Sequence, residues 1–308
     1  MKQISMVEIR LTDEEVEAAT AVLRSGALRQ GPECEAFEQE FAEKTGAKYA
    51  VTSASGTAAL HVAYMSFLEK GDEVLVPSFT FFATASSVAV AGGTPVFCDL
   101  EPGTLTLDLE DAERKVTERT RAISPVHIFG NPCDMDAVRA FAEKHGLRVV
   151  WDAAQAHGAR YDGRDVGSFG DFACYSFYPS KNMFVGEGGI TTTGDEALYH
   201  RMRHLRSHGE TGKYIHTLLG LNYRMTDVEA AIGRKQLMRL DEMLERRRRN
   251  AAALTAGFRE VKGIRVQSIL PKGLHAFHQY AILVDEQAFG ISRDELSQRL
   301  TGAGNSRQ

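Results

Sequence analysis

Residues 148–158 read Arg-Val-Val-Trp-Asp-Ala-Ala-Gln-Ala-His-Gly, an apolar strand that ends on an acidic residue. Open α/β sheets bind their ligands beyond the carboxyl ends of the strands, and Asp152 stands at such an end. A carboxylate in that position is costly unless a donor or a cation pairs with it. Taken alone, Asp152 is therefore either a ligand-binding group or the residue that forms a helix cap or loop turn.

The segments around this strand alternate between strand-like and helix-like patterns. Short β-branched or aromatic runs occupy residues 49–52, 73–76, 95–99, 122–128, 172–177 and 189–193. Helix-like segments lie at residues 35–45, 58–69, 82–91, 109–116, 135–145 and 195–206. This alternation predicts an α/β fold with a mostly parallel central sheet flanked by helices. Several strands are apolar almost throughout, which indicates that both faces of the sheet are covered.

The C-terminal part is expected to form a smaller unit. Residues 227–258 read as one long helix rich in Ala, Leu, Glu and Arg, and residues 292–300 begin an amphipathic helix shortly before the chain stops. We expect a large domain over residues 1–245, which includes the N-terminal segment, and a partial small α/β domain over residues 246–308. A unit of that size is small for a domain, so we expect a chain truncated after about residue 300 rather than a small domain completed by the N-terminal segment.

Composition excludes several classes of protein. The 308 residues carry 36 Lys and Arg against 41 Asp and Glu, a net charge of −5, which does not fit a general nucleic-acid binder. Cys34, Cys98, Cys133 and Cys174 show no CxxC spacing, so neither a disulfide framework nor a cysteine-rich zinc site is expected. The first ten residues have no apolar signal region, and no apolar run is long enough to span a bilayer. We therefore expect a cytoplasmic protein without a membrane or nucleic-acid partner.

A second candidate site lies at residues 53–60, Ser-Ala-Ser-Gly-Thr-Ala-Ala-Leu. A strand leads into this stretch, Gly56 allows a tight turn, and Thr57 stands at the start of a helix. Free N–H groups and the helix dipole there favour a phosphate, although an ordinary Thr57 N-cap is the simpler interpretation. Neither GxGxxG nor GxxxxGK[ST] occurs, so nothing favours a dinucleotide or P-loop site.

A third candidate is Lys181, which ends the stretch Phe-Ala-Cys-Tyr-Ser-Phe-Tyr-Pro-Ser-Lys at residues 172–181. A lysine in these aromatic surroundings can lose hydration, which lowers its pKa and frees the amine for Schiff-base chemistry. The alternative is a surface lysine whose stem covers an apolar patch. Residues 186–189, Gly-Glu-Gly-Gly, either admit a planar ligand close to the backbone or form a turn.

Together, a phosphate cradle, an acidic residue at a strand end and a desolvated lysine are the parts of a pyridoxal 5'-phosphate (PLP) site. On these residues the chain resembles the DegT/DnrJ/EryC1/StrS family of PLP-dependent sugar aminotransferases of fold-type I, over residues 31 to about 300. The shared motifs follow in order: Ser55-Gly56-Thr57, Pro77-Ser78-Phe79-Thr80-Phe81, Asp152-Ala153-Ala154-Gln155, Ser176-Phe177 with Lys181, Gly186-Glu187-Gly188-Gly189, and Gly220-Leu221-Asn222-Tyr223-Arg224-Met225.

The resemblance implies a role for each site residue. It makes Lys181 the covalent attachment point of PLP and Asp152 the partner of the pyridine nitrogen. It puts Gln155 near the phenolic oxygen of the ring and Phe81 on the ring face. It assigns the phosphate to Gly56, Thr57 and Ser176, with Asn222 reaching it from the second subunit of a homodimer.

The resemblance also implies a reaction. An amino group would pass from an amino acid, expected to be glutamate, to a keto sugar carried on a nucleotide, in polysaccharide or antibiotic sugar biosynthesis. Family members that dehydrate sugars have a histidine in place of the lysine, so Lys181 favours transamination. Dehydration, keto-cyclitol transamination and a non-catalytic regulator on the same fold stay open as alternatives, although a regulator needs neither Lys181 nor Asp152.

Two further patterns are interpreted as surface features. His200, His204 and His208 have helical spacing, but no carboxylate or cysteine pattern accompanies them, so we expect an exposed helix face and no metal site. The run Arg246–Arg249 lies on a helix that also carries acidic residues, and we expect it to be a solvated surface.

Overall fold

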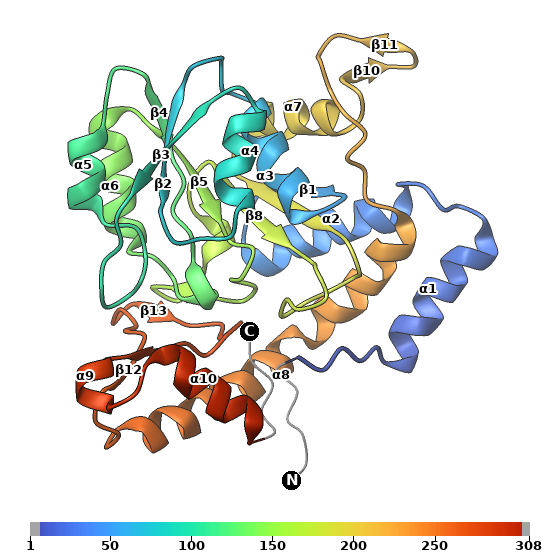
Figure 1. Cartoon of the computed structure of the whole chain (residues 1–308). Coiled ribbons are helices and arrows are strands. Elements are labelled where there is room, and N and C mark those ends of the chain that lie inside the picture. Colours follow the sequence, from blue (N-terminus) through green and yellow to red (C-terminus); the bar gives the residue numbers. More distant parts are fainter. Residues whose placement is uncertain (1–6, 304–308) are drawn as a thin grey trace.

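The computed structural model describes residues 7–303 and has a seven-stranded sheet at its centre (Figure 1). The strand order is β1-β9-β8-β5-β4-β2-β3. The bounds are β1 Tyr49–Ser53, β2 Glu73–Pro77, β3 Thr94–Cys98, β4 Thr120–Ile123, β5 Arg148–Asp152, β8 Phe172–Ser176 and β9 Gly189–Thr193. Only β9 runs against its neighbours in this sheet, β1 and β8; the other pairs are parallel. The predicted mostly parallel α/β fold is confirmed.

Helices cover both faces of the sheet and create two hydrophobic cores. One face is covered by α3 (Gly56–Met65), α4 (Ala83–Val90) and α7 (Glu196–Arg206). The other is covered by α2 (Pro32–Thr45), α5 (Leu109–Lys115), α6 (Met135–His145) and α8 (Asp227–Phe258). Strand residues alternate between the cores, since Val150 packs on the first face and Trp151 on the second. Both faces are therefore buried, as the apolar strands predict.

Several predicted bounds need correction. The strand expected over residues 122–128 ends at Ile123, because Pro125 offers no N–H to the ladder and a 3-10 turn follows at Ile128–Gly130. The helix expected from residue 58 begins at Gly56. An additional helix, α1 (Asp13–Ser25), packs on α8 and begins with a capping box formed by Thr12 and Glu15.

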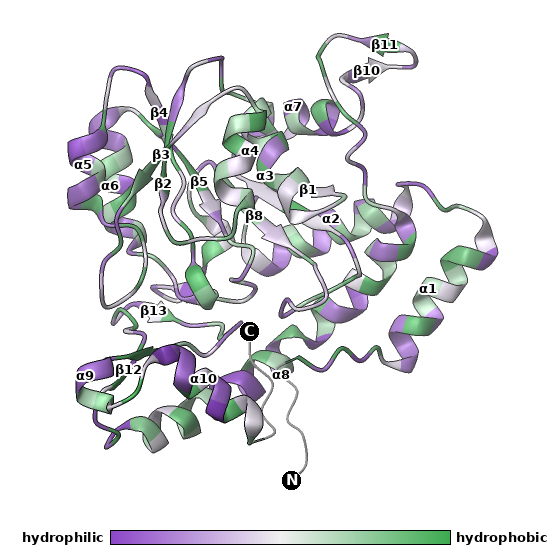
Figure 2. Cartoon of the chain, viewed as in Figure 1, coloured by the Kyte–Doolittle hydropathy of each residue, from purple (hydrophilic) through white to green (hydrophobic). Residues whose placement is uncertain are grey.

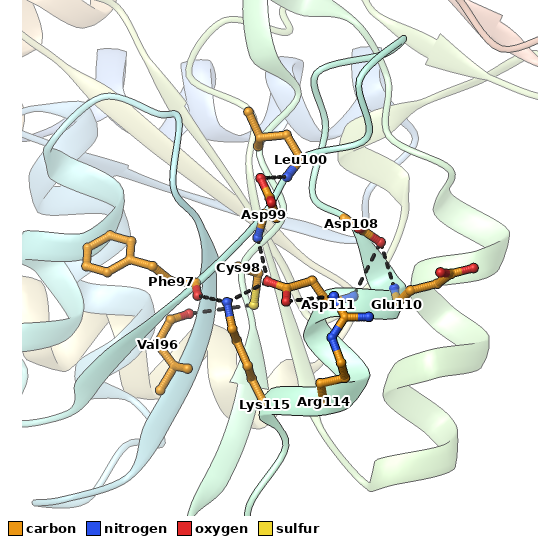
Figure 3. A network of polar contacts seen from close by, with 10 residues as sticks. All are labelled: Val96, Phe97, Cys98, Asp99, Leu100, Asp108, Glu110, Asp111, Arg114 and Lys115. Atoms are coloured by element: carbon orange, nitrogen blue, oxygen red, sulfur yellow. Dashed lines mark hydrogen bonds and ion pairs between the residues drawn. The ribbon is translucent and has the colours of Figure 1, made fainter.

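Polar contacts fix α5 to the neighbouring strand β3 (Figure 3). The Asp111 carboxylate accepts a hydrogen bond from the Asp99 N–H at 2.7 Å and from Lys115 Nζ at 2.5 Å. Lys115 also donates to the Phe97 carbonyl at 2.7 Å, and Asp108 caps the first turn of the helix. This cluster lies at the edge of the sheet that β3 forms and stabilises the scaffold there.

The smaller C-terminal unit lies below the sheet, around the second half of α8 (Figure 1). It contains a two-stranded sheet of β12 (Ile264–Val266) and β14 (Ile282–Val284), with β13 (Gly273–Leu274), α9 (Glu286–Phe289) and α10 (Arg293–Gly302). Figure 2 shows that α10 is largely hydrophilic, and none of its side chains is buried. Helix α8 runs without a break across the expected boundary at residue 245, so the division into two domains stays a prediction.

Two further segments matter for the site. Residues 207–224, here called the arm, project from the body and carry the hairpin of β10 (Glu210–Gly212) and β11 (Ile215–His216) (Figure 1). Residues 275–279, here called the strap, contact Gly130 and Asn182 through the backbone of Ala276. A third small sheet joins β13 to β6 (Arg160–Tyr161) and β7 (Arg164–Asp165). Within residues 7–303, no helix combines the length and the apolar character needed to cross a membrane.

Candidate active site

The predicted site residues meet at the carboxyl edge of the parallel strands. Asp152 is the last residue of β5 and Ser176 the last of β8. Strand β1 ends at Ser53 and leads directly into Gly56, the first residue of α3. Because these strands lie close together in the sheet and point the same way, their carboxyl ends bring the three candidate stretches to one place.

The phosphate cradle forms where the start of α3 meets the end of β8. Ser55, not Thr57, is the N-cap, and its hydroxyl accepts the Ala58 N–H at 3.1 Å. The N-cap interpretation of Thr57 is therefore wrong, since Thr57 is the second helical residue and is exposed. The N–H groups of Gly56 and Thr57 have no partner within the helix. A Cβ on Gly56 would lie 2.5 Å from Ser176 Cβ, so only glycine allows this approach.

Asp152 is 4% exposed, and each of its carboxylate oxygens has one hydrogen bond. The Thr84 hydroxyl donates to Oδ2 at 2.6 Å, and the Ala154 N–H donates to Oδ1 at 3.1 Å. Burial raises the pKa of Asp152, whereas these two bonds and the charge of Lys181 oppose the rise. No α-helix follows the strand here, so the helix-cap interpretation is wrong, and the Ala154 bond is a local loop turn. The second oxygen, Oδ2, is bound by Thr84 from helix α4.

Lys181 lies five residues after β8 and is half-buried. Burial lowers the pKa of its amine, and the negative charge of Asp152 opposes that shift. This result supports the expected desolvated lysine over a lysine lying on the surface. A lowered pKa increases the fraction of neutral amine, which is the nucleophilic form.

The remaining predicted residues, Gln155, Phe81 and Asn222, range from half-buried to exposed. Gln155 is half-buried, and its Oε1 accepts the Phe129 N–H at 2.5 Å, which leaves the amide nitrogen as a donor toward a ligand. Phe81 lies in the loop between β2 and α4 and is 73% exposed. Asn222 is exposed on the arm, where it forms an isolated bridge with Ser207. The carbonyl of the next residue, Tyr223, accepts the Ala54 N–H at 2.8 Å, so this part of the arm adjoins the turn that leads into the cradle.

Four residues near Lys181 or Asp152 were missed by the sequence analysis: Thr84, His157, Asn182 and His278. Burial lowers the pKa of His157 to about 3 and that of His278 to about 2, with the charge of Lys181 as a further cause in both. Both ring nitrogens of His157, Nδ1 of His278 and Oδ1 of Asn182 are buried without a partner among the described residues. His157 lies within the quoted stretch 148–158 and Asn182 directly follows Lys181, whereas nothing in the sequence signals His278.

The two surface interpretations need partial correction. Helix α7 ends at Arg206, so His208 does not share a helix face with His200 and His204. No group of three potential metal ligands occurs within the described part of the chain. In the basic run, Arg247 donates to the carbonyls of Phe277 and His278, and Arg248 donates to those of His275 and Gly158. Half of this run therefore fastens the strap instead of facing solvent.

The arrangement fits PLP. A buried carboxylate with a raised pKa suits a protonated ring nitrogen, which would supply its missing counter-charge. Unpaired N–H groups at the start of α3, beside Ser176, suit a phosphate. A desolvated amine at Lys181 suits a carbonyl carbon. The fold and this site define a PLP-dependent transferase of fold-type I.

Comparison with known proteins agrees with that class. The chain belongs to the DegT/DnrJ/EryC1/StrS aminotransferase family, whose profile matches residues 10–306. It is 40% identical to the spore coat polysaccharide biosynthesis protein SpsC of Bacillus subtilis (strain 168) over 296 residues, and the matched region covers 92% of this chain and 76% of SpsC. It is 39% identical to the dTDP-3-amino-3,4,6-trideoxy-alpha-D-glucose transaminase of Streptomyces venezuelae over 309 residues, and the matched region covers 98% of this chain and 80% of the transaminase.

Solved structures give the same result. DesV of S. venezuelae in complex with a ketimine intermediate superposes with a TM-score of 0.95 at 38% identity, over 99% of this chain and 83% of DesV. The E. coli GDP-4-keto-6-deoxy-D-mannose-3-dehydratase with bound hydrated PLP superposes with a TM-score of 0.92 at 28% identity, over 99% of this chain and 84% of that one. The chain is thus a PLP-dependent sugar aminotransferase, and the expected family, fold and cofactor are confirmed.

Proposed function

We propose that this enzyme transfers an amino group from an amino acid, glutamate being the expected donor, to the keto group of a nucleotide-linked sugar. The observation that carries the proposal is that Lys181, a desolvated amine, and Asp152, a buried carboxylate, lie at the same edge of the sheet and each influences the pKa of the other through its charge. A lysine at position 181 favours transamination over dehydration, because the dehydrating members of the family carry histidine there.

The chain's own residues have distinct tasks in this reaction. PLP, when bound, supplies an electron sink for the substrate carbon. Lys181 Nζ would hold the cofactor and, once displaced by the donor amine, take a proton from the donor carbon and return it to the cofactor side. Asp152 would keep the ring nitrogen protonated by its charge. The N–H groups of Gly56 and Thr57, with the Ser176 hydroxyl, would hold the phosphate.

Chemical trapping tests the assignment of Lys181. PLP-loaded protein is reduced with borohydride, and peptide mass analysis should place the adduct on Lys181. Lys181→Ala should give no adduct and no 2-oxoglutarate from glutamate with a panel of keto sugar nucleotides, whereas Lys70→Ala, at an exposed position, should behave like the parent protein. An adduct on another lysine, or normal turnover by Lys181→Ala, contradicts the proposal.

We further propose a homodimer with shared active sites. The arm carries apolar side chains in solvent, with Tyr214 81%, Ile215 59% and Leu219 90% exposed. Asn222 is exposed at the base of the same arm. Both observations support an arm that packs on a second subunit and brings Asn222 to the phosphate there. A closed two-fold dimer is the commonest assembly that makes such an exchange reciprocal.

A mixing experiment distinguishes this arrangement from a local turn role of Asn222. Lys181→Ala and Asn222→Ala proteins are unfolded together and refolded. If Asn222 acts across the interface, a mixed dimer contains one site with both residues native, so activity returns. If Asn222 acts within its own chain, every site in the mixed dimer lacks one residue. Demonstrated mixed dimers without activity would exclude the shared site.

A further inference from the structure

We propose that Thr84, itself held by Thr80, is a positioning residue that fixes the carboxylate of Asp152 for the ring nitrogen of the cofactor. The inference rests on the proposed role of Asp152 and concerns Thr84, which lies outside all the quoted motifs, and Thr80, to which no role was assigned. Thr84 is in the first turn of α4 and is completely buried, with 0% of its surface exposed. Its hydroxyl lies 2.6 Å from Asp152 Oδ2, across 68 residues of sequence.

Proton counting gives this contact a direction. An ionised carboxylate only accepts hydrogen bonds, so the single hydroxyl hydrogen of Thr84 points to Asp152. Thr84 Oγ1 also lies 2.8 Å from Thr80 Oγ1. Because the hydrogen of Thr84 is already used, Thr80 must be the donor in that second bond. The chain of hydroxyls therefore runs from Thr80 through Thr84 to Asp152 and ends on the negative charge.

The carboxylate is held from two sides. Thr84 follows β2 and donates to Oδ2, whereas the Ala154 N–H follows β5 and donates to Oδ1. Rotation of the carboxylate about its terminal torsion would break at least one of these bonds. Each oxygen keeps one further lone pair, so the Asp152 carboxylate can still accept a ring N–H in one fixed orientation.

Neither helix capping nor packing explains why residue 84 carries a hydroxyl group. Its hydroxyl is not the cap of α4, whose N-cap is Phe82 without a side-chain hydrogen bond. A packing role would need only the volume of the side chain, which valine reproduces. The hydrogen bond, by contrast, favours the charged form of a carboxyl group that burial pushes toward its neutral form.

The test compares Thr84→Val, which keeps the volume and loses the hydroxyl, with Thr84→Ser, which keeps the hydroxyl. We expect the dissociation constant of PLP to rise about tenfold in Thr84→Val, as for the loss of one hydrogen bond to a charged group, and to stay near the parent value in Thr84→Ser. In the apoprotein, infrared spectra of the Asp152 carboxyl, identified by its loss in Asp152→Asn, should show a higher pKa in Thr84→Val only.

A matched control is Thr45→Val, another buried threonine in a helix, whose hydroxyl donates to backbone carbonyls in α2. It should leave both the dissociation constant of PLP and the pKa of Asp152 unchanged. In the Asp152→Asn background, Thr84→Val should weaken PLP binding no further, because the two residues act as one unit. Should Thr84→Val not fold, Thr80→Val must shift both readings in the same direction by a smaller amount.

Several outcomes overturn the inference: an unchanged PLP affinity in Thr84→Val, equal losses in Thr84→Ser and Thr84→Val, or additive losses with Asp152→Asn. None of these measurements uses a sugar or an amino donor. A wrong proposal for the substrates would therefore leave them unaffected, and a wrong role for Thr84 would leave the transamination assay of the parent protein unaffected.

Discussion

Gly56→Ala should destabilise the apoprotein because it places a methyl group inside the cradle. The new Cβ would lie 2.5 Å from Ser176 Cβ and 3.1 Å from Ser176 Cα. The surroundings cannot yield easily, since Ser176 pairs with Gly189 of β9, and a Cβ on Gly189 would itself lie 2.3 Å from the Ser55 carbonyl oxygen. The two backbone segments are already in contact there.

The size of the effect follows from two opposing contributions. Overpacking typically costs about 1–3 kcal/mol. Replacing glycine by alanine gives back about 0.4–1 kcal/mol by restricting the unfolded chain. We therefore expect a net loss of roughly 1–2 kcal/mol in the free energy of unfolding. Gly257→Ala in α8 is the control, because a Cβ there meets nothing within 4 Å and should give only the gain.

Urea unfolding of the apoprotein measures this difference as a shift in midpoint at constant slope. The companion variant Ser176→Gly removes the atoms that collide, so the double variant Gly56→Ala with Ser176→Gly should lose much less than the two single losses combined. A Gly56→Ala protein as stable as Gly257→Ala, or a double variant no more stable than the sum of the two single losses predicts, would contradict the collision with Ser176.

Three further predictions concern the scaffold. Lys115, the Asp99 N–H and Arg114 lower the pKa of Asp111 to about 2. The ionised Asp111 therefore stabilises the fold above its unfolded pKa near 4, and this stabilisation is lost as the pH falls toward 2. Asp111→Asn should make the free energy of unfolding depend less on pH between 4 and 2. Burial lowers the pKa of His157 to about 3. Below about pH 6.5 the unfolded chain therefore binds a proton that the folded chain does not, which favours unfolding. His157→Phe should reduce the slope of the free energy of unfolding against pH, between pH 6 and 4, by about 1.4 kcal/mol per pH unit. Glu38→Leu leaves Arg206 buried without its counter-ion and should cost about 3–5 kcal/mol in urea unfolding, whereas Glu245→Leu in an exposed ion pair should cost less than about 1 kcal/mol.

The sequence predicts the elements whose signals are local. Strand β5 and helix α8 have the expected bounds, because an apolar run ending in Asp152 and a long apolar periodicity after Thr226 are complete within their own segments. Helix α1 was missed although Thr12 and Glu15 form a capping box, because Glu15 reads as a surface charge and is in fact buried against Arg239.

Contacts between distant segments could not be predicted in the same way. Thr84 meets Asp152 only because β2 and β5 end at one edge of the sheet, and no local pattern encodes that distance. The run of four arginines was misread for another reason: consecutive helical residues point about 100° apart, so Arg247 and Arg248 face the strap while Arg246 and Arg249 are exposed. The residue letters alone do not distinguish these directions.

The strap has a consequence for how the protein is made. Asn182, next to the proposed cofactor lysine, donates to the Ala276 carbonyl at 3.0 Å, and the Ala276 N–H donates to Gly130 at 2.9 Å. Ala276 is 94 residues further along the chain than Asn182. At a synthesis rate of about 5–20 residues per second, the ribosome delivers it roughly 5–20 s after the lysine. During that interval the sheet can form while Asn182 and Gly130 still lack their contacts with the strap, so a nascent chain passes through a stage in which this flank of the site is open.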